Sequence, residues 1–213
     1  MKIVIIGATG LIGNRLVHDL LQSSSKIELT TITRKKIQIE NDQLNQIIYP
    51  DLSLKTLSSL QLSADHFICC LGTTIKQAKT KENFKAVDLD LAVEFANLAK
   101  RSNAKSFHVI SSKGANSDSL FFYNRVKGEM EKKIEDLSLP SVYIYRPSLL
   151  IGDRQEKRTG EKIGINSYHL LKRFLPNNLQ KQIGSEVESI VKKMAENILG
   201  HQNGIHIIES NQF

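Results

Sequence analysis

Residues 2–21, KIVIIGATGLIGNRLVHDLL, contain two hydrophobic patterns that meet at a cluster of glycines. Residues 2–6 form a short apolar run rich in β-branched side chains, which is typical of a buried strand. Residues 11–22 place leucine, isoleucine and valine at helical spacing, which predicts an amphipathic helix. The turn between the strand and the helix therefore holds three glycines: Gly7, Gly10 and Gly13.

The size and composition of the chain indicate one soluble globular domain. The 213 residues, 40% hydrophobic and 24% charged, can bury a full core as a single domain over 1–213. No apolar run reaches the roughly 18 residues of a membrane span, and the run after Lys2 is too short for a secretory signal peptide. The two cysteines, Cys69 and Cys70, are adjacent and cannot join distant segments, so we expect a reducing, cytoplasmic location.

The formal net charge of +7 raises the question of a nucleic-acid partner. Basic side chains are interspersed with acids, as in EMEKKIEDL at residues 129–137, and no stretch interleaves aromatic with basic residues. This pattern favours a solvated surface over a nucleic-acid interface.

Strand-like and helical patterns alternate along the chain. Strands are expected at residues 2–6, 27–33, 46–49, 65–70, 105–110, 141–146 and 205–208. Helices are expected at residues 11–22, 53–60, 81–101, 120–137 and 187–199. The alternation predicts an α/β fold with a doubly wound, Rossmann-like parallel sheet. Residues 152–185 break the pattern and contain Pro176, so we expect a small inserted C-terminal lobe there.

The glycine spacing of the first turn, G-x-x-G-x-x-G, suits a phosphate group. Ligands of open parallel sheets bind beyond the carboxyl ends of the strands. There the N–H groups at the start of a helix can hold an anion, and glycines let it approach the backbone. Because this turn follows a strand and opens an amphipathic helix, it favours a dinucleotide pyrophosphate over a turn that serves packing alone.

The second predicted strand ends in basic residues, where an NAD site usually has an acid. That acid, about 20 residues after the glycines, binds the ribose 2′-hydroxyl; this chain has Arg34 and Lys35 within TITRKK. A guanidinium attracts a 2′-phosphate that a carboxylate would repel. The sequence therefore predicts a preference for NADP(H) over NAD(H), and the alternative is an exposed basic turn without a ligand.

The fourth predicted strand ends in FICCLGTT, residues 67–74, where we expect a second close approach of the backbone to the ligand. Gly72 would allow this approach, and Thr73 and Thr74 would either face the ligand or cap a following turn. For the two cysteines, small buried thiols are favoured over a redox pair, because a disulfide between neighbours is strained.

The stretch that contains the candidate catalytic side chains is HVISSKGANSDSLFFYNRVKGEMEKKI, residues 108–134. A strand is expected to end at Ser111 and Ser112, and a helix then places Tyr123 and Lys127 on one face. An ammonium beside a phenol favours the phenolate, and a hydroxyl at the strand end can hold a substrate oxygen. Together these groups would supply a general acid for carbonyl reduction or a base for alcohol oxidation.

Five motifs cover nearly the whole chain: GATGLIG, CCLGTT, SSKGA, YNRVKGEME and YRPSLLIGDRQEKRTGE. They resemble the short-chain dehydrogenase/reductase superfamily, and more narrowly the atypical branch that includes the HIV Tat-interacting protein. The resemblance implies a Rossmann domain that binds NADP(H) and a Tyr-Lys-Ser active site. In this chain the site would consist of Tyr123, Lys127 and a serine, with Ser112 favoured and Ser111 left open.

The resemblance also implies cofactor contacts at individual positions. The pyrophosphate would meet Gly7, Thr9, Gly10, Leu11 and Ile12, and the 2′-phosphate would meet Arg34. The adenine would lie near Asp51 and Leu52, and the ribose near Leu71 and Gly72. Lys127 and Tyr123 would line the nicotinamide end, with Pro147 after the sixth strand. One departure stands out: classical members of the superfamily carry an asparagine on the fourth helix where this chain has Asp88, which argues against a classical proton relay.

The expected lobe gathers charged residues close in sequence: Asp153, Arg154, Glu156, Arg158 and Glu161. Arg154 and Arg158 would meet an anionic group of the substrate or cofactor, or the cluster would pair with itself. The histidines, His169 among them, lack metal-ligand spacing, so no metal site is expected.

The sequence as a whole predicts an NADP(H)-dependent oxidoreductase that acts on a small carbonyl or alcohol. The alternative is a non-catalytic NADP(H)-binding sensor that works through a protein partner. The two differ in whether Tyr123 transfers a proton during turnover.

Overall fold

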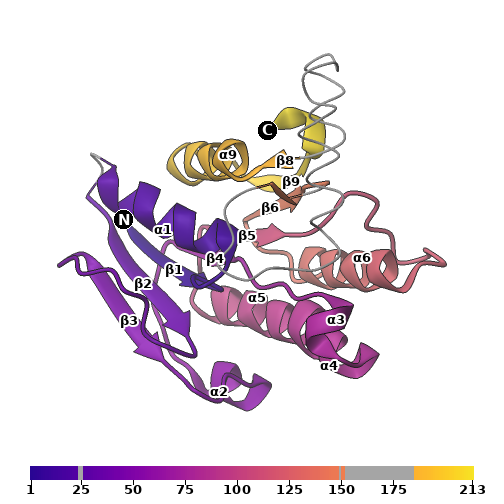
Figure 1. The fold of residues 1–213 in the computed structure, drawn as a ribbon. Helices are drawn as coiled ribbons and strands as arrows, with labels where there is room; N and C mark the ends of the chain where they lie inside the picture. Colours follow the sequence, from indigo (N-terminus) through magenta and orange to yellow (C-terminus); the bar gives the residue numbers. More distant parts are fainter. Residues whose placement is uncertain (24–25, 149, 152–184) are drawn as a thin grey trace.

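A seven-stranded parallel sheet forms the centre of the computed structural model (Figure 1). The structure describes residues 1–23, 26–148, 150–151 and 185–213. The strand order is β3-β2-β1-β4-β5-β6-β9, which confirms the doubly wound α/β class. The strands are β1 (Lys2–Ile6), β2 (Glu28–Thr33), β3 (Leu44–Ile48), β4 (His66–Cys69), β5 (Ser106–Ile110), β6 (Ser141–Arg146) and β9 (Gly204–Glu209).

Helices cover both faces of this sheet (Figure 1). One face carries α1 (Leu11–Gln22) and α9 (Val187–Leu199); the other carries α2 (Leu54–Ser59), α5 (Leu91–Arg101) and α6 (Phe122–Glu135). The helix expected over 81–101 is one helical path with a π-helix, η1, inside it: α4 (Lys81–Lys85), η1 (Ala86–Asp90) and α5. The smaller elements are α3 (Ile75–Ala78), the 3₁₀ helix η2 (Ser210–Gln212), and the paired strands β7 (Leu150–Ile151) and β8 (Ser185–Glu186).

The predicted strands and helices agree with the observed ones to within two residues at each end. Helix α3 was not expected, because four residues are too few to show a helical period. Thr74 caps this helix: its Oγ1 accepts a hydrogen bond from Gln77 N at 3.2 Å. The charged cluster and His169 of the expected lobe at 152–185 lie outside the described residues, which include only Ser185 of this range.

The inner strands β1, β4, β5 and β6 are buried along almost their whole length, which is typical of a sheet covered on both faces. The edge strands β3 and β9 are largely half-buried or exposed. In β1, Val4 and Ile6 join the core cluster under α5 and α6, whereas Ile3 and Ile5 join the cluster under α1 and α9. No helix in the described part of the chain is both long and apolar enough to cross a membrane.

The carboxyl ends of the parallel strands all meet at one edge of the sheet. The segments that follow β1, β2, β3, β4, β5 and β6 contain the predicted site residues, in order Gly7–Ile12, Arg34 and Lys35, Asp51 and Leu52, Leu71 and Gly72, Ser111 and Ser112, and Pro147. The strand order reverses between β1 and β4, which is where doubly wound sheets form a crevice for ligands.

Candidate functional site

Gly7 and Gly13 pack the first turn tightly against the sheet. Gly7 has a φ of +85°, and a Cβ there would lie 2.5 Å from the carbonyl carbon of Cys70. A Cβ on Gly13 would lie 2.4 Å from the carbonyl oxygen of Gly7. No side chain fits at either distance, so close packing of α1 and of the β4 end against the turn requires both glycines.

Gly10 plays a different part, because it is the N-cap of α1. It provides no side chain to accept hydrogen bonds from the first turn of the helix, and that turn contains no acidic residue. Thr9 and Gly10 are exposed, Leu11 is half-buried and Ile12 is buried. An anion at this helix start would therefore meet backbone N–H groups and the positive end of the helix dipole.

The turn after β2 presents its basic side chains to solvent. Thr33 is buried, and its Oγ1 donates a hydrogen bond to the Lys35 carbonyl at 2.8 Å, which shapes the turn. Arg34 and Lys35 are exposed. After the neighbouring strand β3, Asp51 is exposed and Leu52 is partly buried against the core.

A buried ion pair lies between the end of β4 and helix α6. The Lys127 Nζ lies 2.8 Å from the Asp88 Oδ1, and the two side chains are 3% and 1% exposed. The Lys127 ammonium also donates to the carbonyl of Ile110, the last residue of β5, at 3.3 Å. The other Asp88 oxygen, Oδ2, accepts from the backbone N–H of Thr73 at 2.8 Å, just after Leu71 and Gly72.

The charge of Lys127 is maintained by this pairing. Burial is the largest single influence and acts to lower the pKa of Lys127, but the charge of Asp88, the charge of Tyr123 and the hydrogen bond to Asp88 together outweigh it. The pKa of Lys127 is therefore raised above its usual value, and the side chain is an ammonium at neutral pH.

The two serines after β5 have different environments. The Ser111 hydroxyl donates a hydrogen bond to Glu131 Oε1 on α6. Ser112 is also buried, but its Oγ has no hydrogen-bond partner among the described residues. A buried hydroxyl without a partner is costly unless something else binds it. Ser112 is thus available to a ligand, whereas Ser111 is already engaged.

Tyr123 lies in the first turn of α6, one turn before Lys127. Its side chain is 39% exposed, and its ring lies 5.5 Å from that of Phe84 on α4. Before it, Leu120 and Phe121 are 94% and 75% exposed. The phenol therefore borders solvent at the same edge of the sheet as the serines.

A second charged group, not expected from the sequence, supports this edge. Arg146, at the end of β6, binds Glu131 at 2.6 and 3.1 Å and Glu209 of β9 at 2.9 Å. Hydrogen bonding to Glu131 is the main cause that raises the pKa of Arg146. Glu131 thus links Ser111 to Arg146, and so ties the end of β5 to α6 and β6. Only its position one turn after Lys127 could have signalled this role.

The remaining expected residues are placed as follows. Pro147 is buried, and its carbonyl accepts from Lys113 N at 2.8 Å, which joins the ends of β5 and β6. Cys69 and Cys70 are free thiols. Burial raises the pKa of both, that of Cys69 to about 12. The described residues contain no cluster of metal-ligating side chains.

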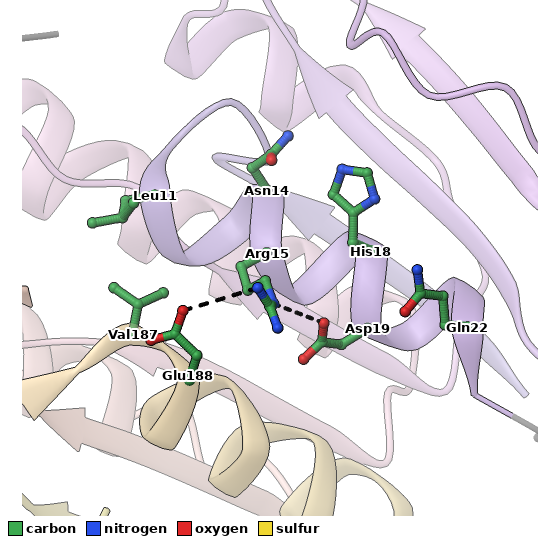
Figure 2. A pocket seen from close by; sticks show the side chains of 8 residues that line it. All are labelled: Leu11, Asn14, Arg15, His18, Asp19, Gln22, Val187 and Glu188. Atoms are coloured by element: carbon green, nitrogen blue, oxygen red, sulfur yellow. Dashed lines mark hydrogen bonds and ion pairs between the residues drawn. The ribbon is translucent and has the colours of Figure 1, made fainter. Parts of the chain in front are cut away.

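A groove of about 490 Å³ lies between α1 and α9 (Figure 2). Its polar side chains partly pair with one another: Arg15 lies 2.9 Å from Asp19 and 3.9 Å from Glu188. Leu11 lines it, but Tyr123, Lys127 and the two serines do not.

A family model described as HIM1 matches residues 20–182. The chain belongs to the HIM1 family. It is 32% identical over 206 residues to "Protein HTATIP2" of Rattus norvegicus, an alignment that covers 95% of this chain and 83% of the relative. This family membership and the fold confirm the expected resemblance to the atypical short-chain dehydrogenases/reductases.

Fungal relatives correct the expected location of this HIM1-family chain. "Protein FMP52, mitochondrial" of Lodderomyces elongisporus is 33% identical over 74% of this chain and 70% of its own length. "Protein fmp52, mitochondrial" of Aspergillus niger is 34% identical over 76% and 72%. The prediction of a cytoplasmic location is therefore wrong, because it rested on cysteine usage, which reports redox conditions and not the compartment.

Solved structures with the same fold include dinucleotide complexes. The UDP-glucuronic acid 4-epimerase of Bacillus cereus, solved with NAD, matches with a TM-score of 0.68 at 15% identity, covering 98% of this chain and 78% of that one. WbmG of Bordetella bronchiseptica, also solved with NAD, matches with a TM-score of 0.70 at 14% identity, covering 99% and 73%. At this identity the likeness shows the fold of the chain.

Proposed function

We propose that this protein binds NADP(H) and reduces or oxidises a small carbonyl or alcohol. The observation that carries the proposal is the Ser112 hydroxyl, buried without a partner, at the same sheet edge as the Lys127 ammonium and Tyr123. The residues present fit a nicotinamide dinucleotide, because the glycine turn offers an uncapped helix start for a pyrophosphate. The NAD complexes of structures with the same fold support this choice of ligand.

Different residues would contact different parts of the dinucleotide. Backbone N–H groups of Thr9, Leu11 and Ile12 would hold the pyrophosphate. The Gly10 N–H donates to the Gly7 carbonyl at 3.0 Å, so Gly7 and Gly10 would keep the turn narrow beside it. Asp51 and Leu52 would border the adenine, and Leu71 and Gly72 would border a ribose. Pro147 would lie at the nicotinamide end.

The choice of NADP(H) rests on the turn after β2. Arg34 and Lys35 are exposed there, and the turn TITRKK contains no carboxylate to repel a 2′-phosphate. A bidentate guanidinium contact would favour the phosphorylated cofactor.

The bound dinucleotide would supply or accept a hydride, and the side chains at the sheet edge would hold the substrate oxygen and transfer its proton. Ser112 Oγ would donate a hydrogen bond to the substrate oxygen and hold it in place. Tyr123 would give its proton to that oxygen during reduction, or take it during oxidation. Lys127 would hold the nicotinamide ribose with the ammonium hydrogen that has no partner among the described residues.

A second candidate function is a sensor that binds NADP(H) and a protein partner without turnover. The exposed Leu120 and Phe121 favour it, because they put apolar surface directly before the helix that carries Tyr123.

Cofactor choice is tested by calorimetric titration of NADPH and NADH. NADPH should bind about tenfold more tightly or better, the worth of one charge-assisted contact. Arg34→Asp should erase or reverse this preference. Lys26→Asp is the matched control, because it makes the same charge change at an exposed position before β2. Equal dissociation constants in the unaltered protein would remove the NADP(H) assignment.

Turnover is tested by NADPH absorbance decay over a panel of aldehydes, ketones and quinones. Tyr123→Phe should keep cofactor affinity and lower turnover by roughly 100-fold or more. Unchanged turnover in this variant would refute the role of Tyr123. The sensor would be favoured if no substrate in the panel is turned over by the unaltered protein and Tyr123→Phe binds NADPH with unchanged affinity.

A further inference from the structure

Asp88 joins four parts of the candidate site through one buried carboxylate. It belongs to η1, the π-helix between α4 and α5. Its Oδ1 holds Lys127 of α6, and Lys127 in turn holds the last carbonyl of β5, that of Ile110. Its Oδ2 holds the Thr73 N–H in the segment after β4. π-Helical turns are frequent at functional sites, and this one contains Asp88.

Only a carboxylate satisfies both contacts of this position. Lys127 Nζ and Thr73 N are both donors, at 2.8 Å from the two Asp88 oxygens. An asparagine has one oxygen and one NH₂ group, so it would turn a donor toward a donor on one side. The two donors at this position therefore require the two acceptor oxygens of an aspartate.

The charged and titratable groups around Lys127 come from three elements. Asp88 faces it from η1, Tyr123 acts on it from its own helix, and Cys69 acts on it from β4. Burial disfavours the ammonium, so its charge depends mainly on Asp88. Loss of the carboxylate would leave a buried cation without its counter-ion.

We propose that Asp88 is a positioning residue that fixes the Lys127 ammonium and ties it to the cofactor segment after β4 through Thr73. The proposal rests on the proposed function, because it concerns the same site. Binding of a ribose next to Leu71 and Gly72 and orientation of the Lys127 ammonium would then be coupled, since both depend on the same carboxylate. Asp88 acts through Lys127 and touches neither substrate nor cofactor.

Asp88→Asn tests the proposal in the full chain labelled with ¹³Cε-lysine, with the Lys127 signal assigned by its loss in Lys127→Met. In Asp88→Asn the Lys127 signal should titrate at lower pH than in the unaltered protein, and the NADPH dissociation constant should rise about tenfold. Asp90→Asn is the matched control: it makes the same charge change in η1 on a half-buried side chain, and should alter neither quantity.

An unchanged Lys127 titration in Asp88→Asn would overturn the proposal. Absence of NADPH and NADH binding in the unaltered protein would instead overturn the proposed function, and the lysine titration would still decide whether Asp88 controls Lys127. If Asp88→Asn does not fold, the neutral pair Asp88→Asn with Lys127→Met replaces it. Positioning through Lys127 predicts that the pair folds, because it leaves no buried charge unpaired; a pair that also fails to fold overturns the proposal.

Discussion

Acid should destabilise this fold through two histidines buried in the sheet. The Ser106 hydroxyl lies between them, 2.7 Å from Nδ1 of His66 and 2.8 Å from Nε2 of His108. Nδ1 of His108 lies 3.1 Å from the Tyr145 hydroxyl, which accepts from Asn197 at 3.1 Å. The Tyr145 hydroxyl can therefore donate to Nδ1 of His108, Nε2–H of His108 to the Ser106 hydroxyl, and the Ser106 hydroxyl to Nδ1 of His66. Both rings are neutral in this arrangement. A proton added to either ring turns an acceptor into a donor and breaks this chain.

The size of the effect follows from His66. Burial, followed by the charge of His201, lowers the pKa of His66 from 6.5 to about 4. Above pH 6.5 the ring is neutral in both the folded and the unfolded chain. Between pH 6.5 and about 4 only the unfolded chain takes up the proton, so stability falls as the pH falls. The shift corresponds to about 3 kcal/mol. Burial also lowers the pKa of His108, with the same sign.

Urea unfolding at several pH values between about 7 and 4 measures this loss. His66→Phe removes one titrating group from the chain, so its free energy of unfolding should fall by about 3 kcal/mol less over this range. The control is His18→Phe, at an exposed position on α1, which should follow the unaltered protein. Asp65, whose pKa is lowered to about 2 by a hydrogen bond from the Lys2 backbone and by Lys105, loses its stabilisation mainly below its usual pKa of 3.8, near the bottom of this range, and it is present in both proteins. Equal pH dependence in the unaltered protein and His66→Phe would refute the reasoning.

The fold could be predicted because its signals are local and repeated. Inner parallel strands buried on both faces are largely apolar, as KIVII shows for β1, and β1, β3, β4, β5 and β6 are each followed by helical segments before the next strand of the sheet. Parallel strands end at one edge, so residues as distant as Gly7 and Pro147 could be assigned to one site without any contact information. Gly7 and Gly13 also show a limit of sequence-based site prediction: the close packing of the turn requires both glycines, so their presence alone does not show that a ligand binds there.

The parts that escaped prediction depend on which side chains meet across elements. Ser111 and Ser112 are adjacent and chemically equal in the sequence, and only the contact with Glu131 on α6 separates them. The Asp88–Lys127 pair joins residues 39 positions apart, and neither spacing nor composition encodes such an encounter. The sequence indicated a departure at Asp88 but not its partner.

Three substitutions test the geometry around the site. Gly13→Ala places a Cβ 2.4 Å from the Gly7 carbonyl oxygen, so it should cost about 1–3 kcal/mol in thermal or urea unfolding and weaken NADPH binding. Ser111→Ala removes a donor from buried Glu131, so it should lower stability by about 1–3 kcal/mol with cofactor affinity unchanged. Ser112→Ala should do the opposite: its hydroxyl has no partner within the described residues, so its removal should leave the free energy of unfolding unchanged or raise it, while turnover falls because the substrate oxygen loses its donor. If Ser112→Ala instead destabilises the protein as much as Ser111→Ala and turns over normally, Ser112 is a structural residue and the serine of the site has been assigned wrongly.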